Sequence, residues 1–332
     1  MTKIERILLN LRFVRFITAK SKKIILPGFD GVPLYDVVIF FWEEVIQEGL
    51  NERAAAIAYN FLMAIPPTCL FLFTLIPNLP FVPTNTIKTQ LHVIITDIIP
   101  ATTHNKNLIT FVDSFFTQGK IGLLSFGFVL LIYFASNGMM GLMRSFNKSS
   151  IGFSKRTELH TRWIAIKLTF LIMGLLLGCI VLLIMQGTVL SWLGLKHNLL
   201  VQFVSTFRWL FILGLIFFTF AFIYKYAPAV TKRWRLISPG SIVGAVLSVL
   251  ATLGFSLFVN NFGKYNALYG SIGTVIVFMV VIYINSLVLL IGYELNASIH
   301  SLKAMAEERE KLENIKGMPD AAGIPQQPPA KT

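Results

Sequence analysis

The sequence has little charge. Only 14% of its 332 residues are Asp, Glu, Lys or Arg, against about 25% in a soluble globular protein. Hydrophobic residues make up 55% of the chain, and 29 residues are Phe. A chain of this length would suggest two or three soluble domains, but this composition leaves too few polar side chains to cover them. The composition predicts one integral membrane domain instead.

The motifs of metal, nucleotide and hydrolase chemistry are absent. The chain has two cysteines, Cys69 and Cys179, both inside apolar runs, and five widely separated histidines. No HxxxH, HxH or CxxC spacing offers a metal site, and neither GxxxxGK[ST] nor GxSxG occurs. We therefore expect no metal, no cofactor, no disulfide framework and no enzymatic activity. An ATP-driven pump within this chain is disfavoured, although a separate ATPase subunit stays open.

Long apolar runs are what the sequence does have. A helix needs about 17 to 25 residues to cross the hydrocarbon core of a bilayer. Six runs reach that length: about residues 54–76, 121–143, 163–190, 199–224, 237–262 and 271–293. The predicted fold is all-α, a polytopic membrane protein with six transmembrane helices and additional interfacial amphipathic helices.

The chain divides into three regions. Residues 1–53 form a basic amphipathic N-terminal region, with an interfacial helix expected over Leu34 to Gly49. Residues 54–300 form the six-span membrane domain, and short amphipathic helices are expected between residues 77 and 120. Residues 301–332 form a polar tail, disordered at its Pro-rich end.

Basic residues predict the orientation. If the N-terminus is cytoplasmic, only six of the 29 Lys and Arg residues fall on or near the other side: Lys88, Lys106, Lys120, Lys196, Arg208 and Lys264. This asymmetry places both termini in the cytoplasm. The net charge of +13 lies in short loops, so the expected partners are membrane lipids, with anionic inner-leaflet lipid at the basic N-terminus. Nucleic acid is not an expected partner.

The first span carries candidate pathway residues. Arg53 lies at its cytoplasmic edge, Tyr59 and Asn60 lie within it, and Pro66 and Pro67 lie near its middle. Adjacent prolines remove two backbone donors, so the helix should kink or break and leave free carbonyl groups. Such carbonyl groups suit a solute or ion path, and a purely structural kink is the alternative.

The second span ends with polar and small residues. Ser136 and Asn137 are further candidate pathway residues and should face protein or a cavity rather than lipid, and Arg144 follows at the cytoplasmic end. Gly138 and Gly141 allow another helix to approach closely. GxxxG spacings, such as the one formed by Gly240 and Gly244 in the fifth span, are packing signals of the same kind.

Glu294 is the most informative acidic residue, because it closes the apolar run of the sixth span. An acid at membrane depth is costly and is usually paired or functional. Its candidate partners lie at the cytoplasmic ends of other spans: Arg53, Arg144, Lys167 and Lys225. A structural ion pair is favoured over a proton or substrate site.

Five strings together resemble a known family. RAAAIAYNFLMAIPP, YKYAPAV, SPGSIVGAV, YNALYGSIG and LLIGYELNA occur in that order, and the chain is similar over about residues 35 to 300 to the YihY/virulence factor BrkB family, once labelled ribonuclease BN. The matching motif positions are Pro228, Gly240, Tyr265, Tyr269, Gly270, Gly292 and Glu294. Met140 and Met143 stand where the family often has Asn and Trp, which puts a polar role at that inner site in doubt.

The resemblance implies a bacterial inner-membrane protein that acts as a transporter or flippase-like exporter of a lipid or other envelope-related substrate. The first and sixth spans would then line a pathway, with Glu294 and Arg53 or Arg144 as a gating or structural charge group. A non-transporting membrane scaffold is the alternative, and a homo-oligomer stays open. The ribonuclease label is less favoured, because the scattered histidines and acids supply no acid/base or metal cluster.

Overall fold

The computed structural model describes residues 18–47, 49–75, 121–147, 152–192, 198–261 and 265–316, and isolated residues between 89 and 113. The basic N-terminal residues 1–17, most of the segment 77–120 and the end of the tail lie outside the described residues. The regular structure of the described part is helical. Its only pairing of extended backbone is an isolated antiparallel bridge between Phe153 and Val230.

Six long helices correspond to the six predicted spans. They are α4 (Leu50–Leu75), α7 (Ile121–Ser145), α8 (Glu158–Trp192), α9 (Asn198–Tyr226), α10 (Pro239–Asn261) and α11 (Tyr265–Lys316). Within the described residues, five helices are long and apolar enough to cross a membrane, and the apolar stretch Leu210–Tyr226 of α9 is shorter. The prediction of an all-α polytopic membrane protein is confirmed.

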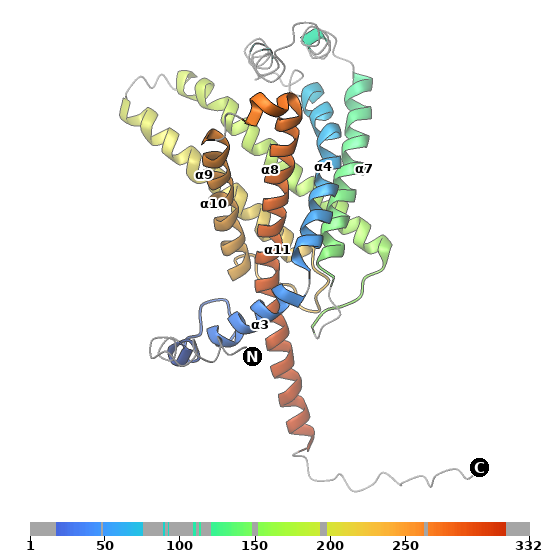
Figure 1. Cartoon of the computed structure of the whole chain (residues 1–332), viewed down its shortest axis with the longest axis vertical. Coiled ribbons are helices and arrows are strands. Elements are labelled where there is room, and N and C mark those ends of the chain that lie inside the picture. The colour runs from blue at the N-terminus through green and yellow to red at the C-terminus, as the bar shows by residue number, and fades with distance from the viewer. Residues whose placement is uncertain are drawn as a thin grey trace, which may run out of the picture.

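The six helices pack as a closed ring. In order around it, α4 packs on α7, α7 on α8, α8 on α9, α9 on α10, α10 on α11, and α11 returns to α4. In Figure 1, α11 stands between α4 on one side and α10 on the other. The ring order follows the chain order because the connections link neighbouring helices.

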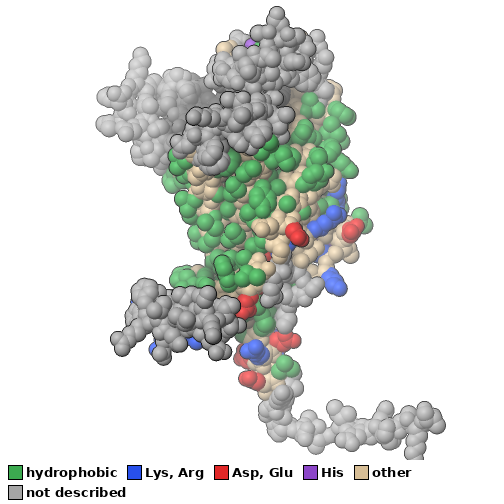
Figure 2. All heavy atoms as spheres, in the orientation of Figure 1, with side chains coloured by type: hydrophobic (Ala, Val, Ile, Leu, Met, Phe, Trp, Pro, Cys, Tyr) green, Lys and Arg blue, Asp and Glu red, His purple; other side chains and the backbone are tan. Residues whose placement is uncertain are grey.

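Apolar and charged side chains separate along the bundle. Figure 2 shows hydrophobic side chains over the upper and middle parts of the helices, and charged ones gathered toward the end where α3 (Leu34–Gln47) lies. The same end holds the connection 227–238 and the described residues 146–147 and 152–157 of the connection between α7 and α8. We call it the basic end. The apolar zone is the surface that a membrane protein exposes to lipid.

Two elements differ from what the sequence led us to expect. The helix α4 is continuous across Pro66 and Pro67, so the chain does not break there. The helix α11 continues past the predicted domain boundary at residue 300 as far as Lys316, and Figure 1 shows it projecting beyond α3. Its polar extension, which includes EEREKLE, consists mainly of strong helix formers.

Candidate functional site

A buried ion pair joins α4 to α11. Arg53 Nη1 lies 2.8 Å from Glu294 Oε1, and the Glu294 side chain has no exposed surface, whereas that of Arg53 is 16% exposed. A carboxylate removed from water needs a close cation to remain ionised. Of the candidate cations, the structure brings Arg53 to Glu294. Arg144 is exposed instead.

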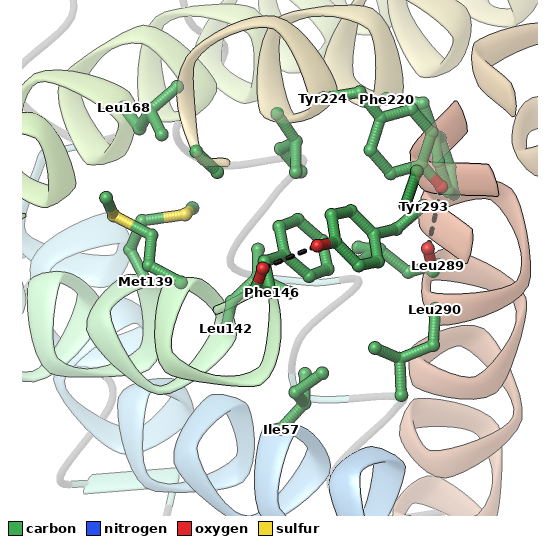
Figure 3. Close-up of a cluster of buried hydrophobic side chains, with 14 of the residues drawn as sticks. Ile57, Met139, Leu142, Phe146, Leu168, Phe220, Tyr224, Leu289, Leu290 and Tyr293 are labelled. Carbon is green, nitrogen blue, oxygen red and sulfur yellow. Dashed lines mark hydrogen bonds between the residues drawn. The ribbon is translucent and has the colours of Figure 1, made fainter. Parts of the chain in front are cut away.

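Arg53 and Tyr293, the neighbour of Glu294 in sequence, close the C-terminal end of α7. Arg53 Nη2 donates to the carbonyl oxygen of Ser145, and the Tyr293 hydroxyl donates to that of Phe146. The rings of Phe146 and Tyr293 stack with centroids 4.0 Å apart, as Figure 3 shows. The last carbonyl groups of a helix have no partner within it. Here α4 and α11 supply the missing donors, so three helices are tied together at the basic end.

The polar residues of the second predicted span face protein. Ser136 is buried and donates to the Tyr133 carbonyl group of its own helix at 3.0 Å. Asn137 Oδ1 accepts a hydrogen bond of 2.5 Å from Arg162 at the start of α8. The Arg162 guanidinium also lies over the Tyr133 ring, 5.6 Å from its centroid. Sequence reasoning missed Arg162, although its place at the start of the third predicted span was a usable signal.

The candidate pathway residues of α4 point to different neighbours. Asn60 donates to the Ala56 carbonyl group at 2.8 Å and packs on Gly141 of α7, where an added Cβ would lie 2.6 Å from its Nδ2. Tyr59 is 60% exposed. Pro66 is exposed and Pro67 is buried. The structure therefore does not bring these four side chains to one point.

Two of the family-motif glycines form a close helix crossing. A Cβ on Gly240 of α10 would collide with the carbonyl oxygen of Gly292 on α11, and one on Gly292 would lie 2.7 Å from the Gly240 carbonyl oxygen. Nearby, the buried Tyr224 hydroxyl of α9 donates to the Leu289 carbonyl group at 2.8 Å, as drawn in Figure 3. These motif positions hold α9, α10 and α11 together.

Pro228 belongs to a second capped helix end. It is fully buried, and its carbonyl oxygen, together with that of Ala227, accepts hydrogen bonds from Arg156 just beyond the end of α9. Burial and, to a smaller extent, the nearby positive charge of Arg233 lower the pKa of the Arg156 guanidinium. The other motif positions, Tyr265, Tyr269 and Gly270, lie in the first turns of α11, where side chains are outside the described residues.

A partly open apolar cavity of about 290 Å³ lies between the helices of the ring, with the exposed Leu176 in its wall. Its wall comes from five of the six helices: α4, α7, α8, α9 and α11. It includes Ala64, Ala135, Met139, Met173, Ile223 and Leu289. Tyr293 lies one helical turn beyond Leu289, so the stacked Phe146 and Tyr293 rings close the bundle next to the cavity, toward the basic end.

Among the described residues of the cavity wall, threonine is the only polar type. Thr68, Thr169 and Thr219 donate to carbonyl groups four residues earlier in their own helices, at 2.6, 2.8 and 2.8 Å. Their hydroxyl protons are therefore already used, and the wall offers a ligand mainly hydrocarbon. In the described part of the chain, no group of three or more His, Cys, Asp or Glu residues could hold a metal ion.

Comparison with known proteins identifies the family. The chain matches the family model for virulence factor BrkB over residues 41–316. It is 27% identical over 275 residues to the putative ribonuclease-like protein YfkH of Bacillus subtilis, covering 81% of this chain and 96% of that protein.

Two further relatives carry membrane-protein names. The chain is 25% identical over 284 residues to the UPF0761 membrane protein NTHI0384 of Haemophilus influenzae, covering 83% of this chain and 100% of that protein. It is 26% identical over 259 residues to a UPF0761 membrane protein of Coxiella burnetii, covering 76% of this chain and 89% of that protein. No solved structure matches the chain. This chain, an integral membrane protein, belongs to the virulence factor BrkB family.

Proposed function

We propose that the protein is a transporter or flippase-like exporter of a lipid or other envelope-related substrate in the bacterial inner membrane. The observation that carries this proposal is the apolar cavity whose wall comes from five of the six helices. A packed interior leaves few voids larger than a water molecule. A hollow of about 290 Å³ walled by five helices is close to the size of a small-ligand pocket.

The chemistry of the wall selects the class of substrate. An ion or a polar solute that enters an apolar hollow loses its hydration without gaining hydrogen bonds. Alanine, methionine and isoleucine side chains, and threonines whose hydroxyl protons are used within their helices, instead suit a hydrocarbon chain. The substrate class is therefore an amphipathic molecule whose apolar part enters the ring.

A groove beside the ring offers a route from the bilayer. It has a volume of about 420 Å³ and lies between α4 and α11, with Ala58, Tyr59 and Leu62 on one side and Met279 and Tyr283 on the other. Its two walls belong to the first and sixth predicted spans, which agrees with a pathway lined by these two spans. Tyr59 would then contact the substrate before it enters the ring.

The ion pair and the aromatic stack form the closed gate in this proposal. Arg53, Glu294, Phe146 and Tyr293 tie α4, α7 and α11 together on the basic side of the cavity. Passage in that direction requires these contacts to separate. By the distribution of Lys and Arg, the basic end is cytoplasmic, and both termini lie on that side.

Reconstitution tests the proposal. The purified full chain is placed in liposomes, and movement of fluorescent phospholipid between leaflets is followed together with dissipation of a pH gradient. We expect lipid movement well above that of protein-free liposomes. A well-folded protein that moves no lipid would contradict the proposal and favour the scaffold alternative. Degradation of added RNA by the same preparation would instead favour the activity named for the Bacillus subtilis relative.

A further inference from the structure

A polar hollow at the basic end lies apart from the cavity inside the ring. It has a volume of about 170 Å³ and lies between the α9–α10 connection, the segment around Asp30 and the polar part of α11. A smaller hollow of about 50 Å³ shares several of its wall residues, including Trp234 and Arg235. The charged and titratable side chains of the larger hollow are Asp30, Lys232, Arg233, Arg235, His300, Lys303 and Glu307.

Positive charge exceeds negative charge in this wall. Lys303 Nζ forms an ion pair with Asp30 Oδ2 at 3.2 Å, and the Arg233 guanidinium lies over the Tyr226 ring, 5.5 Å from its centroid. Lys232 and Arg235 are exposed, and the structure shows no ion pair for either among the described residues. Two cations therefore remain available to an anion.

Trp234 supplies a buried donor in the same place. Its side chain is only 9% exposed, and among the described residues its Nε1–H has no hydrogen-bond acceptor. The ring is held between Tyr293, at 5.8 Å, and His300, at 6.1 Å between centroids. A buried donor without an acceptor costs about 1–3 kcal/mol. Trp234 lines both hollows, but its Nε1 has almost no accessible surface, so a ligand with an acceptor oxygen would remove that cost after a small shift of the residues that cover this atom.

Two neighbouring cations, Arg156 and Arg233, also favour an anionic ligand in this place. The proximity of Arg233 is a cause, second to burial, of the lowered pKa of Arg156, because two neighbouring cations repel each other. An anion that binds here offsets this repulsion as well as satisfying Lys232 and Arg235.

An apolar groove adjoins the polar hollow. It has a volume of about 460 Å³ and is lined by Phe29, Leu34, Val38 and Trp42 on one side and Leu295 of α11 on another. Phe29 lines the groove and its neighbour Asp30 lines the hollow, so one short segment separates the two. A polar hollow next to an apolar groove matches the headgroup and acyl chain of a lipid.

We propose that this hollow binds the phosphate headgroup of an anionic phospholipid and that the adjoining groove holds an acyl chain of the same molecule. Lys232 and Arg235 contact the phosphate, and the Trp234 Nε1–H donates to one of its oxygens. The site is separate from the apolar cavity between the helices, because no residue lines both. It would fix the depth of α3 and of the basic end in the membrane surface.

Native mass spectrometry of the detergent-purified full chain tests this site. Retention of phosphatidylglycerol is compared with that of phosphatidylcholine for the unchanged protein and for Lys232→Gln/Arg235→Gln. The matched control is Arg309→Gln/Lys311→Gln, which removes the same two kinds of charge from exposed positions of α11 outside the hollow. We expect the hollow variant to lose phosphatidylglycerol preference by about tenfold or more and the control to keep it.

A second variant and a second ligand complete the test. Trp234→Phe keeps an aromatic ring against Tyr293 and removes the donor, and should weaken phosphatidylglycerol binding about tenfold while the melting temperature changes little. Equal retention of the two lipids, or a preference that both hollow variants keep, would overturn the proposal. Displacement of the lipid by inorganic phosphate at equal concentration would identify a free phosphate site and overturn the assignment to a lipid.

Discussion

Gly240 and Gly292 allow two helices to cross closely because neither residue carries a Cβ atom. Each lies where α10 and α11 meet, and a Cβ on either would meet the backbone of the other. The crossing is also held by a hydrogen bond of 2.8 Å from the Gly240 amide to Asn296 Oδ1. Close approach requires glycine here because no other residue leaves room for the partner carbonyl oxygen.

A pair of alanine substitutions on one helix tests this crossing. Gly240→Ala should destabilise the protein by about 1–3 kcal/mol, because its methyl group enters occupied space. Gly254→Ala on the same helix should leave stability unchanged or raise it, since nothing lies within 4 Å of its added Cβ and alanine favours a helix. Thermal unfolding in detergent measures both. Equal melting temperatures for the two variants would contradict the account of the crossing.

At the scale of helices, arginines close the C-terminal ends of neighbours. Arg53 of α4 donates to the end of α7, and Arg156 donates to the end of α9. A guanidinium suits this role because it carries several donors and a positive charge that favours a helix C-terminus. Each contact fixes the position of one helix relative to another. Contacts between apolar side chains, which have no direction, define that position less sharply.

The two partners of the buried pair should not be equivalent. Arg53→Gln leaves the fully buried Glu294 carboxylate without its cation and also removes the cap on α7, so we expect a loss of about 3–5 kcal/mol. Glu294→Gln leaves a partly exposed guanidinium that can still bond to Ser145, and should cost less. Thermal unfolding ranks the two variants. A larger loss for Glu294→Gln would contradict this view of the pair.

The sequence was sufficient for those features that depend on one dominant contribution to the free energy, such as the burial of apolar or charged side chains in the membrane. Long apolar runs determine the spans, and the cost of a buried acid identified Glu294 with Arg53 among its candidate partners. The choice of Arg53 over Arg144 depends on helix rotation and packing, which no run of residues encodes locally. Tyr59 and Asn60 are adjacent in sequence, yet they face different neighbours because successive residues on a helix point about 100° apart. The extension of α11 had a signal, its run of helix formers.

At the scale of the whole molecule, the ring explains how an apolar membrane protein can enclose a hollow. Each helix packs on its two neighbours in the ring. The side chains that fill the interior therefore come from several helices. At the basic end, Tyr224, Phe146 and Tyr293 fill that interior with aromatic rings (Figure 3): Phe146 stacks on Tyr293, and Tyr224 is tilted against Phe146. Beside this layer, smaller side chains such as Ala64 and Ala135 leave the cavity open.

The central claim is that the apolar part of the substrate passes through the cavity, and filling the cavity tests it most directly. Ala135→Phe places a ring inside the cavity, whereas Val129→Phe places one on the exposed face of the same helix, where Val129 is 65% exposed. Both variants are reconstituted in liposomes, and transbilayer movement of fluorescent phospholipid is measured. The account predicts that Ala135→Phe lowers the rate at least tenfold and that Val129→Phe retains it. Equal rates for the two well-folded variants would contradict the account.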